Sequence, residues 1–212
     1  MKHKNPIFLF SKTPHPDVTH IPILKTSFLQ PDIDLSRYDA IVLTSKQAVT
    51  ALDKISPGWK RLPALTVAAK TAEMVKEAGG CFLETGNGYG EGLSEIIISR
   101  YGSYRWLYPR PKVVASDFKE RVMEAGVKID DVVVYETSCN QACRELNLPD
   151  NAVLVFTSPL TIACFLEFFA FKEGHKVVVI GKTTAKALPR YLKYHMPEEP
   201  TVEASVQLAQ TL

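Results

Sequence analysis

An internal repeat is the feature of this sequence that most restricts how the chain can fold. Residues 41–45 read Ile-Val-Leu-Thr-Ser and residues 154–158 read Leu-Val-Phe-Thr-Ser, 113 positions later. The segments at 66–72 and 179–185, which end in Lys-Thr-Ala and Thr-Thr-Ala, are separated by the same 113 positions. One offset therefore relates both pairs without any insertion or deletion. The period is too long for a solenoid and predicts two similar domains of about 100 residues each.

The order of elements within each repeat predicts a parallel α/β fold. Each repeat contains a short apolar strand, a Thr-Ser pair, a helix, a second strand and a second helix. Short apolar strands that alternate with helices are typical of right-handed βαβ units. Further strands are expected at 7–10, 81–83, 106–108 and 132–135, and a further helix at 116–125.

The distribution of these elements along the chain predicts a discontinuous domain. Residues 1–30 hold only one or two strands and cannot bury a core alone, and the second repeat lacks a full set of strands. We therefore expect residues 1–30 and 138–212 to form one α/β domain and residues 36–131 to form the inserted one. The linkers would then be 31–35 and 132–137, and they would act as a hinge beside a cleft.

Composition excludes several classes of protein. The chain has 212 residues and a formal net charge of +2, so nucleic-acid binding would need a local basic patch. The longest apolar stretch, 162–171, is interrupted by Glu167 and is far shorter than a membrane span. The first ten residues do not read as a signal peptide. We expect a cytoplasmic protein that binds neither nucleic acid nor membrane.

The cysteines are expected to be reduced structural thiols. None of Cys81, Cys139, Cys143 and Cys164 forms a C-x-x-C pair, and no histidine lies near them in the sequence. A metal site that uses Cys139 and Cys143 is the alternative, and their spacing favours it only weakly. No metal site is therefore predicted.

Polar residues that follow the predicted strands form the candidate ligand site. Ligands of open parallel sheets bind beyond the carboxyl ends of the strands, where helix N-termini present free N–H groups to anions. Each hydroxyl there can equally be an ordinary helix N-cap, and each lysine an ordinary solvated charge. The candidates are Thr44, Ser45, Thr71, Thr157, Ser158, Thr183 and Thr184, with Lys12, Lys70, Arg110 and Lys182 as additional positive charges.

Two further features have a chemical and a structural interpretation. Residues 86–92 read Gly-Asn-Gly-Tyr-Gly-Glu-Gly, and such a glycine-rich loop is compatible with a nucleotide-dependent enzyme. The spacing, however, is not the G-x-G-x-x-G of dinucleotide-binding proteins. A flexible surface loop is the favoured interpretation. Tyr135 ends a β-branched run beside the predicted hinge, where its phenol is either part of the core or a proton donor at the cleft.

Along nearly its whole length the sequence resembles the uroporphyrinogen-III synthase family. Five segments in a fixed order carry the resemblance: 41–49, 67–72, 133–137, 155–159 and 179–185. It implies two flavodoxin-like, doubly wound parallel-sheet domains joined by a two-stranded linker. The chain departs from the family pattern where Lys12 replaces an arginine, where Gln47 replaces Asn or Arg, and where the helix after the first strand is nearly missing.

The resemblance also implies a function. Members of the family cyclise hydroxymethylbilane, a linear tetrapyrrole, with loss of water and inversion of ring D, and they use no metal or organic cofactor. Carried over to this chain, Tyr135 is the proton donor to the leaving hydroxyl. Gln47 joins the threonines and serines named above as substrate contacts. We expect a monomer that makes transient contact with the upstream deaminase.

A function of another class is compatible with the same pattern. Two similar α/β domains around a hinge also describe receptors that bind a ligand without changing it. A non-catalytic module that binds an anion or a tetrapyrrole is therefore the alternative, and consumption of the ligand distinguishes the two.

Overall fold

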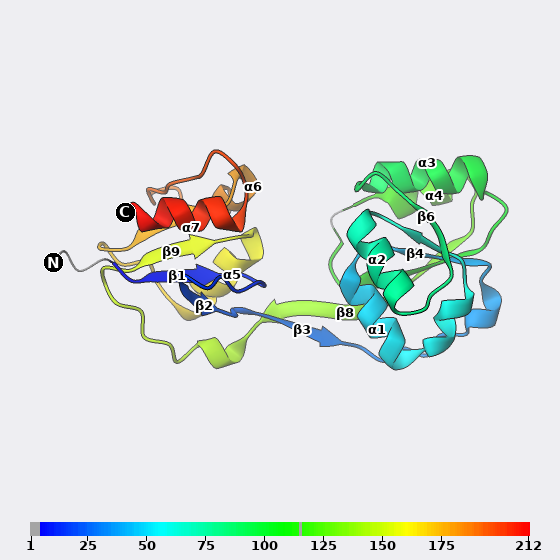
Figure 1. The fold of residues 1–212 in the computed structure, drawn as a ribbon, viewed down its shortest axis with the longest axis horizontal. Helices are drawn as coiled ribbons and strands as arrows, with labels where there is room; N and C mark the ends of the chain where they lie inside the picture. The colour runs from blue at the N-terminus through cyan, green and yellow to red at the C-terminus, as the bar shows by residue number, and fades with distance from the viewer. Residues whose placement is uncertain (1–4, 115) are drawn as a thin grey trace. The chain divides into compact units, whose positions relative to one another are not determined.

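The computed structural model describes residues 5–114 and 116–212, which divide into two compact units (Figure 1). Unit 1 comprises the described chain up to Lys25 together with Ser138–Leu212, and unit 2 is Thr26–Thr137. The chain passes from one unit to the other within β3 (Leu24–Phe28) and again within β8 (Ile129–Cys139). These two strands are neighbours in one sheet.

Unit 1 is built on a four-stranded parallel sheet of order β10-β9-β1-β2. Its strands are β1 (Ile7–Phe10), β2 (Thr19–Ile21), β9 (Val153–Phe156) and β10 (Lys176–Val179). Its helices are η3 (Gln141–Cys143), α5 (Pro159–Phe168), α6 (Lys182–Ala185) and α7 (Val202–Gln210). The strand order reverses between β1 and β9, as in a doubly wound sheet.

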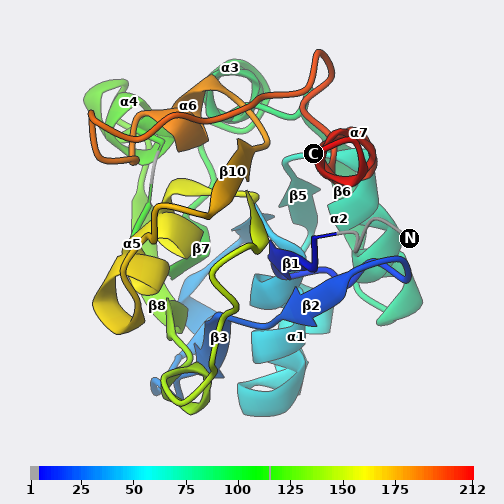
Figure 2. The ribbon, with the colours of Figure 1, turned by 90° about the vertical axis from the view of Figure 1, so that its left-hand side faces the viewer.

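Both faces of the sheet in unit 1 are covered because successive residues of a strand point to opposite faces. Leu154 and Phe156 of β9 pack against α5, whereas Val153 and Val155 pack against Val206 of α7. Figure 2 shows α5 and α7 on opposite sides of these strands. Strands that are buried on both faces need a continuous apolar sequence, which explains why β9 reads Val-Leu-Val-Phe.

Unit 2 is built on a six-stranded sheet of order β3-β8-β7-β4-β5-β6, in which β4 to β8 are parallel. The further strands are β4 (Ala40–Leu43), β5 (Ala64–Thr66), β6 (Phe82–Thr85) and β7 (Trp106–Pro111). The helices are η1 (Leu35–Arg37), α1 (Lys46–Ile55), η2 (Pro57–Arg61), α2 (Ala69–Glu77), α3 (Gly90–Arg100) and α4 (Phe118–Glu124). The strand order reverses between β4 and β7.

The alternation of side chains along β4 explains the layers of unit 2. Ile41 and Leu43 pack with the apolar residues of α1 and α2, and Ala40 and Val42 pack with those of α3 and α4. The two helix pairs consequently lie on opposite faces of the sheet (Figure 1). This three-layer arrangement confirms the predicted α/β class with doubly wound parallel sheets.

The repeat seen in the sequence is also a repeat of structure. Strand β9 and helix α5 begin and end 113 positions after β4 and α1. Ser45 and Ser158 are the N-caps of α1 and α5, and each side chain accepts a hydrogen bond from the backbone N–H three residues later. The second helices of the two repeats, α2 and α6, start after Ala68 and Gly181, which are again 113 positions apart.

The connection between β1 and β2 departs from an ordinary βαβ unit. The described residues 11–18 join the two parallel strands and contain no helix. Parallel neighbours usually need a crossover of about a dozen residues or more. The near absence of a helix after the first strand, noted in the sequence, is therefore a feature of the fold of unit 1.

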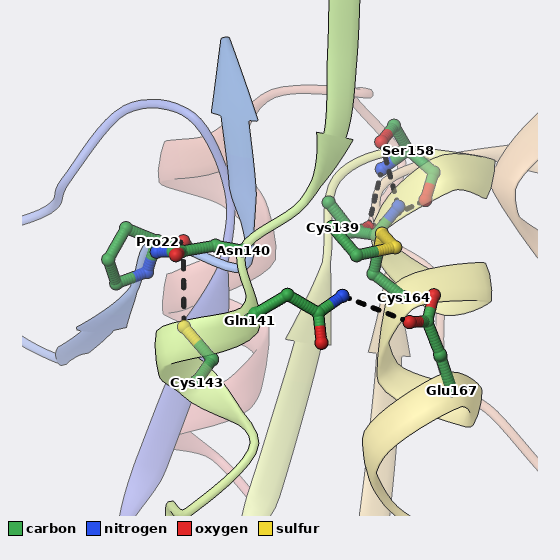
Figure 3. The surroundings of a disulfide bond; sticks show 9 residues. Pro22, Cys139, Asn140, Gln141, Cys143, Ser158, Cys164 and Glu167 are labelled. Carbon is green, nitrogen blue, oxygen red and sulfur yellow. Dashed lines mark hydrogen bonds between the residues drawn. A yellow bond between two sulfur atoms is a disulfide. The ribbon is translucent and has the colours of Figure 1, made fainter. Parts of the chain in front are cut away.

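The expectation of reduced thiols is wrong for two of the four cysteines. Cys139 at the end of β8 and Cys164 on α5 form a disulfide with an S–S distance of 2.06 Å (Figure 3). Cys81 and Cys143 are free. Sequence spacing does not reveal this pair, because its members are 25 residues apart and meet only when β8 reaches α5.

The residues that follow Cys139 hydrogen-bond to α5 and to the segment before β3. The side chain of Gln141 donates to Glu167 of α5 at 3.1 Å, and the Asn140 side chain donates to the carbonyl of Pro22 at 2.9 Å. The Asn140 N–H donates to the carbonyl of Ile23 at 2.8 Å. The residues that follow β8 are thus bound to α5 and to the residues that precede β3.

The described residues contain neither a membrane-spanning helix nor a cluster of metal-ligating side chains. No described helix is both long and apolar enough to span a bilayer. Within residues 5–114 and 116–212, no three His, Cys, Asp or Glu side chains are grouped as ligands for a metal ion.

Candidate functional site

A cavity of about 270 Å³ lies in unit 2 beyond the carboxyl ends of its parallel strands. Its walls come from the residues that follow β4, β5 and β6, from the loop after β7, and from β8. This is the position at which the strand order reverses, where open α/β sheets bind their ligands. The lining residues are Thr44, Ser45, Val67, Gly88, Gly90, Leu93, Tyr108, Pro111, Val113, Val114, Ser116, Phe118 and Tyr135.

Thr44 and Ser45 bring two hydroxyl groups to this cavity. Ser45 has extended backbone angles and caps α1, and its Oγ accepts from the N–H of Ala48 at 3.1 Å. Thr44 Oγ1 lies 3.4 Å from the hydroxyl of Tyr108. The predicted N-cap role and the predicted place at the strand end therefore coincide at this pair. Gln47, near the start of α1, is half-buried.

Tyr135 is buried, with only 6% of its surface exposed, and lines the same cavity. Its ring packs in the core between the sheet and helices α1 and α2, and its hydroxyl donates to Ser45 Oγ at 2.9 Å. Burial raises the pKa of Tyr135, and the hydrogen bond with Ser45 opposes this effect in part. The phenol therefore stays protonated near neutral pH.

Arg110, a predicted positive charge at the site, is bound within the protein. Its Nε pairs with Asp131, and its Nη1 donates to the carbonyls of Pro111 at 2.9 Å and Lys112 at 3.2 Å. Lys119 of α4 pairs with the other oxygen of Asp131. The guanidinium thus fastens the turn after β7, and the geometry gives it a positioning role.

The glycine-rich loop forms one wall of the cavity. A Cβ atom on Gly90 would lie 2.1 Å from Ser116 Oγ and 3.2 Å from Phe118 Cβ, so a larger residue would require Ser116 to change rotamer and Phe118 to shift. Gly88 has a φ of 97°, which glycine adopts at low cost. Packing explains the glycine at position 90 and backbone conformation explains the one at position 88, so neither requires a bound nucleotide.

In unit 1 the equivalent sheet end carries the residues predicted from the second repeat. Thr157 Oγ1 donates to the carbonyl of Phe10 at 3.1 Å, and Ser158 caps α5 in a reciprocal arrangement with Thr161. Lys12 follows β1, and burial of part of its side chain lowers its pKa. Lys182 and Thr183 lie at the start of α6, and both are exposed.

The interpretation of Thr71 and Thr184 as helix N-caps is wrong, and their contact with a ligand stays a prediction. Both are the third residue of their helix and are buried, at 5% and 3% exposure. The caps are Ala68 and Gly181, and neither has a side chain that accepts from the helix N–H groups. Both side chains lie on the side of the helix that packs against the rest of the protein, so they are buried although they belong to the first turn. Lys70 lies on the outer face of α2 and is exposed.

Sequence reasoning missed Tyr108 and Ser116 among the cavity residues. Tyr108 lies in the predicted strand at 106–108, where an aromatic residue reads as core, and it is indeed 2% exposed. Its position at the end of the predicted strand 106–108, directly before Pro109, is the signal that the sequence offers. The pKa of Tyr108 is raised, and burial of its side chain is the largest cause.

Two units that repeat one order of strands and helices, with hydroxyl groups at the carboxyl ends of their sheets, define a duplicated, doubly wound α/β protein. Within this class, the family described as uroporphyrinogen-III synthase HemD matches residues 16–207. The chain therefore belongs to the uroporphyrinogen-III synthase family. No curated protein gives a significant match to the sequence.

Solved structures with this fold include two members of the family. The crystal structure of uroporphyrinogen-III synthetase from Helicobacter pylori is similar with a TM-score of 0.81 at 21% identity, over 98% of this chain and 99% of that one. A mutant uroporphyrinogen III synthase from Thermus thermophilus is similar with a TM-score of 0.56 at 14% identity, over 98% of both chains. At these identities the similarity shows the fold.

Proposed function

We propose that this protein is a uroporphyrinogen-III synthase, which cyclises hydroxymethylbilane to uroporphyrinogen III with loss of water. The observation that carries the proposal is the buried Tyr135 hydroxyl, which donates to Ser45 in a cavity at the strand-order reversal of unit 2. Family membership supplies the reaction class, and this hydroxyl pair supplies a proton donor for it.

The chemistry begins with loss of the terminal hydroxyl of the substrate, for which Tyr135 supplies the proton. The electrophilic azafulvene that results is attacked by the substituted carbon of ring D. The spiro intermediate fragments and recloses with ring D inverted. The steps are proton transfers, cleavage of one C–O bond and changes of carbon–carbon bonds, and none needs an oxidant or reductant, so we propose the reaction without a cofactor.

Positioning is the main task of such an enzyme, because the substrate also closes unaided to the uninverted isomer. Dipoles that are fixed before the reaction stabilise charge at little cost in reorganisation. The N-terminus of α2 suits this task, since its cap residue, Ala68, offers no side-chain acceptor and leaves N–H groups for a carboxylate. Lys70 on the first turn adds a positive charge there.

The remaining contacts are proposed to hold the acetate and propionate arms of the substrate. Thr44, Gln47 and Lys70 are proposed for this task in unit 2, and Lys12, Thr157, Ser158, Lys182 and Thr183 in unit 1, whereas Ser45 is proposed to contact the substrate beside Tyr135. Arg110 is proposed to act by holding the turn after β7. The monomeric state, the cytoplasmic location and the transient contact with the deaminase stay predictions.

Isomer analysis of the product tests the proposed function. Hydroxymethylbilane is generated in situ, purified protein is added without cofactors, and the oxidised type I and type III porphyrins are separated. We expect a shift from type I to type III that scales with protein concentration. Type I alone, from protein shown by circular dichroism to be folded, would reject the enzyme and favour the non-catalytic binding module.

A further inference from the structure

The hydroxyl group of Ser45 has a proton that it does not donate to any group among the described residues. Its oxygen accepts from the Ala48 N–H at 3.1 Å and from the Tyr135 hydroxyl at 2.9 Å. A serine oxygen has two lone pairs, so both acceptor positions are filled and only its own proton remains to be donated. Among the described residues, no side chain or carbonyl accepts that proton.

The hydroxyl groups of Ser45 and Tyr135 differ in how easily a ligand in the cavity can reach them. Tyr135 is 6% exposed, and its hydroxyl proton is directed at Ser45. Ser45 is half-buried and borders the cavity. A ligand hydroxyl in the cavity meets the free proton of Ser45, whereas direct donation by Tyr135 would require its present hydrogen bond to break.

The second repeat shows that capping a helix does not require the tyrosine. Ser158, 113 positions after Ser45, caps α5 and accepts from the Thr161 N–H at 3.3 Å. Its side-chain partner is Thr161, and no tyrosine hydroxyl contacts it among the described residues. The link between Ser45 and Tyr135 is thus an addition to the cap, present in one repeat only.

We propose that Ser45 is a catalytic residue that relays the proton of Tyr135 to the leaving hydroxyl of the substrate. The inference rests on the proposed function and specifies its first step. As the C–O bond breaks, its electron pair stays with oxygen, which takes the Ser45 proton and leaves as water. Ser45 takes the phenol proton of Tyr135. The phenolate regains a proton through Ser45 when ring D loses one on closure, so the enzyme is unchanged overall.

Turnover of single and double variants tests the relay. We expect Ser45→Ala and Tyr135→Phe each to lower kcat at least about ten-fold with little change in KM. The double variant should be no slower than the slower single variant, because both changes interrupt one path. Ser45→Thr keeps the hydroxyl and the cap, so it should restore most of the turnover. Wild-type kcat in Ser45→Ala, or losses that multiply in the double variant, would overturn the relay.

A matched cap variant separates the relay from loss of helix stability. Thr201 caps α7 in unit 1 through the same bond, from the Ala204 N–H at 3.1 Å, and lies outside the proposed site. Thr201→Ala should lower thermal stability as Ser45→Ala does and leave kcat unchanged. An equal loss of kcat in both variants would mean that Ser45 acts only as a cap.

The hydrogen bond can also be followed without turnover. With fluorotyrosine in place of tyrosine, ionisation of the phenols is measured by fluorine NMR. Ser45→Ala should raise the pKa of residue 135, because the phenolate loses a donor, and Thr201→Ala should not. An unchanged titration would overturn the relay in a protein that still makes the type III isomer. Type I product from the wild type would instead reject the proposed function.

Discussion

At the scale of single residues, hydrogen-bond partners decide which candidate side chains are available for chemistry. Arg110 and Tyr135 both follow from the sequence, but Arg110 is bound to Asp131 and to two carbonyls. The Tyr135 hydroxyl donates to Ser45, and its side chain lines a cavity. Burial limits the access of a ligand to the side chains of Thr71 and Thr184, which are 5% and 3% exposed.

Replacing Tyr135 by phenylalanine should lower turnover about ten-fold or more, since the proton source is lost. The ring still fills its place in the core, so the free energy of unfolding should fall by only about 1 kcal/mol. Tyr101→Phe is the control, because it removes a hydroxyl that donates to Glu84 at 3.3 Å in the same unit. Steady-state kinetics with wild-type turnover in Tyr135→Phe would remove this residue from the mechanism.

Asp131→Asn should destabilise unit 2 in a pH-dependent way. Partial burial opposes ionisation of this carboxyl, but hydrogen bonds from Lys119 and Arg110 outweigh it and hold the pKa of Asp131 below its ordinary 3.8. A lowered pKa contributes stability above the unfolded value, and the contribution is lost as the pH falls through the folded value. The variant should be less stable by about 2 kcal/mol at a pH of about 7.

Denaturant unfolding at several pH values checks this sign. The difference between wild type and Asp131→Asn should shrink as the pH falls below 3.8. Asp150→Asn provides a comparison, because the Asp150 carboxylate is exposed and pairs with Lys172 on the surface. A difference for Asp131→Asn that grows toward acid would show that its ion pairs do not stabilise the fold.

At the scale of elements, helix starts and strand ends place the chemistry. Ser45 and Ser158 sit at the same point of two equivalent strand–helix units, and each is fixed by the extended backbone of an N-cap. Tyr135 reaches Ser45 because β8 runs beside β7, with Tyr135 paired to Pro111. A neighbouring strand thus supplies the partner that the strand–helix unit itself lacks.

Opening the Cys139–Cys164 disulfide should weaken the attachment of β8 to α5. A link between residues 25 apart restricts the unfolded chain, which is worth about 3.5 kcal/mol in the chain-entropy account. Cys164→Ala, or wild type in reductant, should therefore lose stability of this order in denaturant unfolding. Cys81→Ser should have little effect, since Cys81 is free and exposed. Equal stability with and without reductant would contradict a disulfide in the folded protein.

At the scale of the whole molecule, each unit has its own hydrophobic core on both faces of its sheet. Unit 1 is centred on Phe10, Phe156 and Phe165, whose rings are in contact. Unit 2 contains Trp59 and Trp106 as its largest fully buried side chains. A chain with two cores is expected to unfold in more than one step.

Hydrogen exchange should reveal this division. Reduction of the disulfide should accelerate amide exchange in β9 and α5 of unit 1. The amides of β4 and α1 in unit 2 should keep their protection, because their packing does not involve the bond. Exchange followed by mass spectrometry with and without reductant measures both regions at once. Equal acceleration in the two units would mean that they unfold as one.

The sequence by itself determined the class of fold, the repeat and the strand-end residues. Apolar strands, N-cap serines and the constant offset of 113 are signals that can be read along the chain without knowing how it packs. Only the tertiary structure decided the disulfide, the hydrogen bond between Tyr135 and Ser45, the ion pair between Arg110 and Asp131, and the burial of Thr71 and Thr184. These depend on which strands become neighbours and on which side of a helix faces the sheet, and packing sets both across long stretches of chain.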